Sequence, residues 1–225
     1  MPKAMRPKSE IERRLLLPLS EYMAEIRIPY ERLEDSVRDR GMPGRRMNMS
    51  AHFKGFAFEV YVKLSMIDFA DASGDFALLW RPSGMLQGGQ RFEMDSWGNT
   101  VFMKKTDSMD VVTEIDAIGF YYHEGVDTVP VGFEITHGRV GKVRVNAKSG
   151  VLSRFYNNSP HICTIKPVNK EYRPGFYNNG LENYSLIAIP YRDEVRRLAR
   201  ALYERSPLGM RKALKTARTW ELGGS

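Results

Sequence analysis

The chain contains a single cysteine and has no long hydrophobic run, and each absence narrows the class of protein. Cys163 has no cysteine partner for an internal disulfide, and no Cys and His residues have the spacing of a zinc site, so we expect a buried thiol. No stretch approaches the ~20 consecutive apolar residues of a membrane helix, and the N-terminal residues lack the hydrophobic region of a signal peptide. We therefore expect a cytoplasmic protein without a membrane partner.

The composition is otherwise that of a folded protein. Hydrophobic residues make up 42% and charged residues 27% of the 225 residues, which suits one domain with a sizeable core. The net charge of +7 is unevenly distributed: residues 84–136 carry nine acidic and three basic residues, whereas residues 192–218 carry nine basic and three acidic ones. Such a basic segment indicates a polyanionic partner such as nucleic acid, although a solvated helix face has a similar composition.

Hydrophobic spacing and turn residues predict the order of helices and strands. Ser9 and Glu12 have the spacing of a capping box, which predicts that a helix begins there, and Pro18 predicts a kink or an end. We predict an α/β (α+β) fold with a mixed central sheet flanked by helices, in three parts: a helical extension and linker (1–49), a core (50–205) and a basic tail (206–225). The predicted helices cover residues 30–40, 50–70, part of 139–156 and the segment after Pro190, and the predicted strands cover 91–104, 113–123, 128–135 and 184–189.

Two consecutive predicted strands each carry a carboxylate on a defined face. Side chains alternate along a strand, so Asp116 shares a face with Glu114 and Ile118, and Glu134 shares a face with Thr136. If the two strands are neighbours and their faces match, Asp116 and Glu134 lie so close that a divalent cation is needed to relieve their repulsion. Oxygen ligands suit Mg²⁺ or Mn²⁺.

A third carboxylate, Glu59, lies in the middle of the largely apolar helix predicted for residues 50–70. A carboxylate in a buried helix needs a cationic partner, a metal or a shifted pKa. Lys63, one turn further along the helix, is the nearest candidate for a cationic partner. Ordinary salt bridges would be the alternative explanation for all three carboxylates.

A helix glutamate, an aspartate on one strand and a glutamate on the next, in this order, resemble the PD-(D/E)XK (restriction-endonuclease-like) nucleases, with archaeal Holliday-junction resolvases nearest in motif order. The resemblance covers about two thirds of the chain. It implies a restriction-endonuclease-like core and a metal-dependent endonuclease that hydrolyses DNA phosphodiester bonds. Asp116 and Glu134 would bind the metal and Glu59 would support it. Thr136 stands where the motif has a lysine, and Lys142, or else Lys148, would replace that lysine.

The remaining candidates concern the nucleic-acid partner. His137 follows the motif and is a secondary candidate for contact with the leaving group or a phosphate. A homodimer is expected if two sites cut two strands. The alternative is a non-catalytic nucleic-acid-binding or assembly module, and the sequence leaves open whether DNA or RNA is bound. The basic residues expected to contact phosphates are Arg139, Arg144, Arg154, Arg196, Arg197 and Arg200.

Overall fold

The chain forms two compact units, each assembled from separated parts of the sequence. One unit comprises Met1–Arg27 and Val62–Pro190, and the other comprises Ile28–Tyr61 and Tyr191–Ser225. The expected extension, core and tail stay predictions. The computed structural model describes residues 8–40, 49–73, 76–79, 115–123, 126–137, 149–150, 153, 160–168, 175–178 and 180–205.

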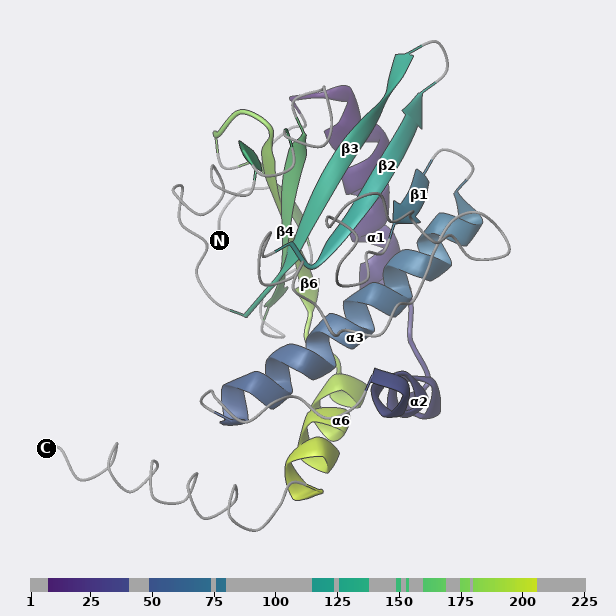
Figure 1. Ribbon diagram of the computed structural model, residues 1–225, viewed down its shortest axis with the longest axis vertical. Coiled ribbons are helices and arrows are strands. Elements are labelled where there is room, and N and C mark those ends of the chain that lie inside the picture. The colour runs from purple at the N-terminus through teal and green to yellow at the C-terminus, as the bar shows by residue number, and fades with distance from the viewer. Residues whose placement is uncertain are drawn as a thin grey trace, which may run out of the picture. The chain divides into compact units, whose positions relative to one another are not determined.

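The first unit contains a six-stranded mixed sheet with the order β1-β2-β3-β4-β6-β5 (Figure 1). The first three strands are antiparallel neighbours, β3, β4 and β6 run parallel to one another, and β5 is antiparallel to β6. The predicted α/β class with a mixed central sheet is therefore confirmed. The strands are β1 (Phe76–Leu79), β2 (Ala117–His123), β3 (Val126–Ile135), β4 (His161–Val168), β5 (Gly175–Tyr177) and β6 (Tyr184–Pro190).

Three of the four predicted strands can be compared with the structure. Those at 113–123, 128–135 and 184–189 correspond to β2, β3 and β6, and the strand predicted at 91–104 lies outside the described residues. The strand β4, which lies between β3 and β6 in the sheet, was not predicted. The first five residues of β4 are all buried, so the strand has no alternating pattern, and its Pro167 argues against a central strand. Neither β1 nor β5 was predicted.

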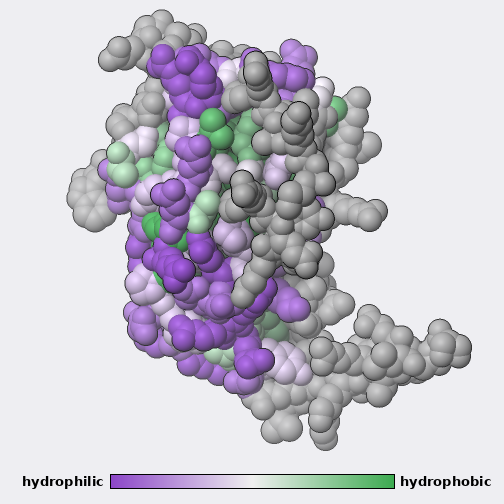
Figure 2. Space-filling view, turned by 180° about the vertical axis from the view of Figure 1, so that it is seen from behind, coloured by the Kyte–Doolittle hydropathy of each residue, from purple (hydrophilic) through white to green (hydrophobic). Residues whose placement is uncertain are grey.

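One face of the sheet is covered by helices. The first helix contains a π-helical turn, η1 (Glu12–Leu16), followed by α1 (Leu17–Glu25), which lies behind the sheet in Figure 1. The C-terminal part of α3 (Met49–Ala72) packs beside α1, since the ring of Phe69 contacts those of Tyr22 and Phe76. Phe76 in turn contacts Phe133 of β3. Hydrophilic side chains dominate the described surface in Figure 2, as expected when the apolar helix faces are buried.

The π-helical turn explains how the first helix passes Pro18. The N–H of Leu17 bonds to the carbonyl oxygen of Glu12, five residues earlier, and this wider turn ends directly before the proline. Proline has no N–H, and its ring clashes with the carbonyl one turn earlier in a regular α-helix. The wider turn accommodates both effects, so the helix continues to Glu25 rather than ending at Pro18.

The second unit consists of α2 (Tyr30–Arg40), the first part of α3 and α6 (Asp193–Glu204). Phe53 and Tyr203 make an edge-on ring contact, and Arg205 bonds to Glu34 of α2. No helix in the described ranges combines the length and apolar composition needed to cross a membrane. The helix predicted after Pro190 is confirmed as α6, and its apolar residues Val195, Leu198, Ala199 and Leu202 are buried.

Candidate functional site

The two predicted metal-binding carboxylates lie at one edge of the sheet. Glu134 is the penultimate residue of β3, and Asp116 directly precedes β2, which runs in the opposite direction. The carboxyl ends of the parallel strands β3, β4 and β6 meet at this edge, which is where open α/β sheets commonly bind ligands. The two strands are therefore neighbours, which is the condition that the sequence left open.

The register of the sheet brings Asp116 opposite Glu134. Ala117 pairs with Phe133, so the next residue in each direction is Asp116 and Glu134. The Ile135 N–H donates to Asp116 Oδ2 at 2.6 Å, and the Asp116 N–H donates to the Phe133 carbonyl at 3.1 Å. The Asp116 carboxylate thus accepts a main-chain donor of β3 just before β2 begins. A hydrogen bond to one oxygen orients a carboxylate, as is usual for metal ligands.

Glu134 has a hydroxyl neighbour on its other side. Thr164 of β4 is its partner in the parallel register, and both side chains are buried, Glu134 at 3% exposed and Thr164 at 0%. The Thr164 hydroxyl makes no hydrogen bond within the described part of the chain. Asp116, Glu134 and Thr164 therefore form a row of oxygen-bearing side chains across three strands, which we call the oxygen row.

On the same face of the sheet, the row of side chains nearer the middle of the strands is apolar, and the row nearer their carboxyl ends is polar. Ile118, Ile162 and Tyr184 belong to one buried cluster and lie on the same face, one step toward the middle of the sheet. On the other side, Thr136 N–H bonds to the Ile165 carbonyl at 3.0 Å, which continues the parallel register and aligns Thr136 with Lys166. Thr164 and Lys166 were not predicted as site residues because β4 was not predicted.

The structure describes only some of the other predicted site residues. Glu59 is 7% exposed and Lys63 is 1% exposed, which confirms that both lie in a buried helix. Glu59 belongs to the second unit, and its role stays a prediction. His137 is exposed. The remaining predicted residues of this region lie outside the described residues: Arg139, Lys142, Arg144, Lys148 and Arg154.

The predicted phosphate-binding arginines of α6 are exposed, and two of them stack on tyrosines. The Arg196 guanidinium lies 5.5 Å from the ring centre of Tyr191 and 3.2 Å from the Asp193 carboxylate. Burial raises the pKa of Tyr191 to about 12, and the charge of Arg196 acts in the opposite direction. Arg197 lies 4.6 Å from the ring centre of Tyr30. Arg200 is exposed on the same helix.

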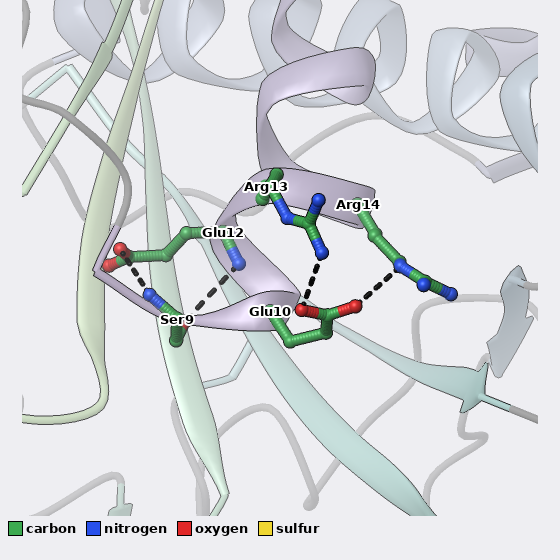
Figure 3. A network of polar contacts seen from close by, with 5 residues as sticks. All are labelled: Ser9, Glu10, Glu12, Arg13 and Arg14. Atoms are coloured by element: carbon green, nitrogen blue, oxygen red, sulfur yellow. Dashed lines mark hydrogen bonds and ion pairs between the residues drawn. The ribbon is translucent and has the colours of Figure 1, made fainter. Parts of the chain in front are cut away.

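A second polar cluster, centred on Glu12, was not predicted as a cluster. Glu12 is 1% exposed, and its Oε1 accepts hydrogen bonds from the Asn178 amide at 2.5 Å and the Ser185 hydroxyl at 2.8 Å. Its Oε2 accepts the main-chain N–H groups of Ser9, at 3.2 Å, and Lys8. The Glu12 N–H donates a hydrogen bond to Ser9 Oγ at 3.3 Å, so the predicted capping box is confirmed (Figure 3).

The Glu12 cluster continues to a buried histidine. His161 Nε2 lies 2.8 Å from Ser185 Oγ, and because the single hydroxyl hydrogen goes to Glu12, His161 must donate from Nε2. Burial lowers the pKa of His161 to about 4, against the smaller opposing effect of the Glu12 charge. His161 pairs with Val131, so by strand alternation it faces the side of the sheet opposite to Glu134. Since Ser185 is fully buried, we interpret this cluster as an anchor for the first helix.

A metal bound at the oxygen row would need further donors in addition to the two carboxylates. Within the described ranges, no three His, Cys, Asp or Glu side chains gather as a metal-binding group. Two carboxylates, a hydroxyl and water are hard oxygen donors of the kind that Mg²⁺ takes. Comparison of the chain with protein-family models, with curated proteins and with solved structures gives no match.

Proposed function

We propose that the chain is a metal-dependent endonuclease that hydrolyses DNA phosphodiester bonds at the oxygen row. The observation that supports this proposal most directly is the register between β2 and β3. This register brings two carboxylates that are separated in the sequence, Asp116 and Glu134, to adjacent positions at the carboxyl edge of the parallel strands. The oxygen donors suit Mg²⁺ or Mn²⁺.

The side chains of the row would divide the work as follows. Asp116 would bind the metal while the Ile135 N–H holds its Oδ2 and fixes the orientation of the carboxylate. Glu134 would bind from a buried position, where the weak screening strengthens its attraction for a cation. The Thr164 hydroxyl would donate to Glu134 or to an ordered water. The metal, when bound, would activate water and neutralise charge on the phosphate.

The arrangement of elements also supports the resemblance to restriction-endonuclease-like proteins. Helix α3 is followed by the antiparallel strands β1, β2 and β3, and β4 then returns parallel to β3. Between β3 and β4, residues 149–150 and 153 are helical. Helix α3, the pair β2 and β3, the helical residues after them and β6 follow one another in the expected order.

A non-catalytic nucleic-acid-binding module is the second candidate. Thr136 cannot supply the positive charge of the motif lysine, and a chain without that charge would bind nucleic acid without cutting it. The stacked arginines Arg196 and Arg197 favour binding to phosphates, because stacking on a tyrosine orients a guanidinium and leaves N–H groups at its edge. In either case the basic α6 would contact the nucleic-acid backbone, and a homodimer would let two sites act together.

The test is a cleavage assay on end-labelled linear, single-stranded and four-way-junction DNA, with Mg²⁺, Mn²⁺ or EDTA. We expect cutting by the wild type only with metal, and a loss of roughly 100-fold or more in Glu134→Gln and in Asp116→Asn. Glu10→Gln is the matched control, because Glu10 is a half-exposed carboxylate that pairs with Arg13 and Arg14. Cleavage that persists in EDTA or in both site variants would refute the assignment. Binding without cutting under every metal condition would favour the non-catalytic module.

A further inference from the structure

We propose that Lys166 is the cation that contacts the scissile phosphate, in place of the lysine that Thr136 replaces. This assignment rests on the proposed nuclease function. Lys166 follows Thr164 by two residues in β4, so both side chains lie on the same face of the sheet as Glu134. It is aligned with Thr136 of the neighbouring strand, which is the position that the resemblance assigns to the lysine.

The dimensions of a sheet put Lys166 within reach of the oxygen row. Neighbouring strands lie about 4.8 Å apart, and alternate residues of one strand lie about 6.6 Å apart. A lysine moved from Thr136 to Lys166 is therefore displaced by one strand spacing, and its four-carbon side chain spans such a distance. The cation would approach the phosphate from β4 instead of β3, on the same face and at the same edge.

The surroundings of Lys166 also favour a ligand-binding role. The side chain is half-buried and makes no ion pair within the described part of the chain. Its partner in β6 is the buried Ala188, which offers no charge. The described residues around Lys166 therefore offer its ammonium group no opposite charge, and a phosphate group bound at this edge of the sheet would supply one.

The chemistry needs a positive charge at this position. In the hydrolysis, the oxygen of water forms a bond to phosphorus while the bond to the leaving sugar oxygen breaks, and a proton from the water ends on the leaving oxygen. Negative charge builds up on the non-bridging phosphate oxygens during this exchange. The Lys166 ammonium group would donate hydrogen bonds to one of those oxygens, which stabilises the transition state more than the bound substrate.

The first test is Lys166→Ala under the cleavage conditions above. We expect kcat to fall by about 100- to 1000-fold with little change in KM, because the contact strengthens in the transition state. Lys166→Arg should retain part of the activity. Lys54→Ala is the matched control, since Lys54 is an exposed lysine of α3, and it should cut like the wild type.

The second test moves the lysine to Thr136, the position aligned with Lys166 on the neighbouring strand. Adding Thr136→Lys to Lys166→Ala returns a lysine to the same row from the neighbouring strand, and we expect it to recover at least tenfold of the lost activity. A lysine with a purely structural role in β4 would not be replaced in this way. Titration calorimetry with Mn²⁺ gives a readout independent of turnover: Lys166→Ala should bind Mn²⁺ like the wild type, and Asp116→Asn should not.

The outcomes separate this assignment from the proposed function. If Lys166→Ala cuts within threefold of the wild type while Glu134→Gln is inactive, the assignment of Lys166 is wrong and the nuclease stands. If Lys166→Ala is inactive but also loses Mn²⁺ binding, the lysine acts on the structure of the site, and the assignment is again wrong. A wild-type chain that neither binds Mn²⁺ nor cuts would overturn the proposed function together with the assignment.

Discussion

Replacing Glu12 with alanine should destabilise the first unit strongly, because four hydrogen-bond donors lose one acceptor. Two of the donors, on Asn178 and Ser185, are themselves buried. A buried donor left without an acceptor costs about 1–3 kcal/mol. The other two are the main-chain N–H groups of Lys8 and Ser9 at the helix start, where loss of a cap costs about 0.5–2 kcal/mol.

The removal of a buried charge offsets part of this loss. Two buried donors and the lost cap together cost about 2.5–8 kcal/mol before this offset, and we expect Glu12→Ala to lose about 3–5 kcal/mol net. With m-values of about 1–3 kcal/mol per molar urea, the unfolding midpoint should drop by more than about 1 M. Circular dichroism during urea titration measures the midpoint.

Glu10→Ala is the control for this prediction. Glu10 lies two residues away and pairs with Arg13 and Arg14 on the surface of the same helix turn (Figure 3). Exposed ion pairs contribute little to stability, so this variant should barely move the midpoint. Equal midpoints for Glu10→Ala and Glu12→Ala would refute the reasoning, since burial and the four donors are what distinguish the two carboxylates.

Two further predictions concern buried titratable groups. Burial holds the pKa of His161 at about 4, below its ordinary value of 6.5, so the unfolded chain binds a proton that the folded chain excludes between these values. Stability should therefore fall as the pH drops from 6.5 to 4, by up to about 1.4 kcal/mol per pH unit, and His161→Gln should remove this slope in urea titrations. Burial also raises the pKa of the Cys163 thiol, so Ellman's reagent should label it only after unfolding. Rapid labelling of the native chain would contradict its burial.

The parts of the fold that follow a simple periodicity were predictable from the sequence. Helix α6 has a regular apolar stripe, and the alternation of β3 correctly separated Glu134 from Phe133. Short-range hydrogen bonding was predictable as well, since the spacing of Ser9 and Glu12 was sufficient to identify the capping box. In each case the information lies within a few neighbouring residues.

The features that were missed depend on contacts between distant residues. β4 is buried on both faces, so its sequence lacks alternation, and only its pairing with β3 and β6 defines it as a strand. Only the pairing of β4 with β3 shows that Lys166 lies beside the oxygen row. Asn178 and Ser185 bind Glu12 across 166 and 173 residues of chain, which no local pattern encodes.

The long separation between Glu12 and Ser185 has a consequence for biosynthesis. The helix that carries Glu12 leaves the ribosome early, but Ser185 is made 173 residues later. At roughly 5–20 residues per second, the helix waits about 10–35 s for the strand that completes its binding site. During that time its apolar residues Leu15, Leu19 and Met23, which are buried in the folded chain, have no finished sheet to cover. A chaperone that binds apolar helices would have access to this segment before β6 is made, and slower translation would lengthen its exposure.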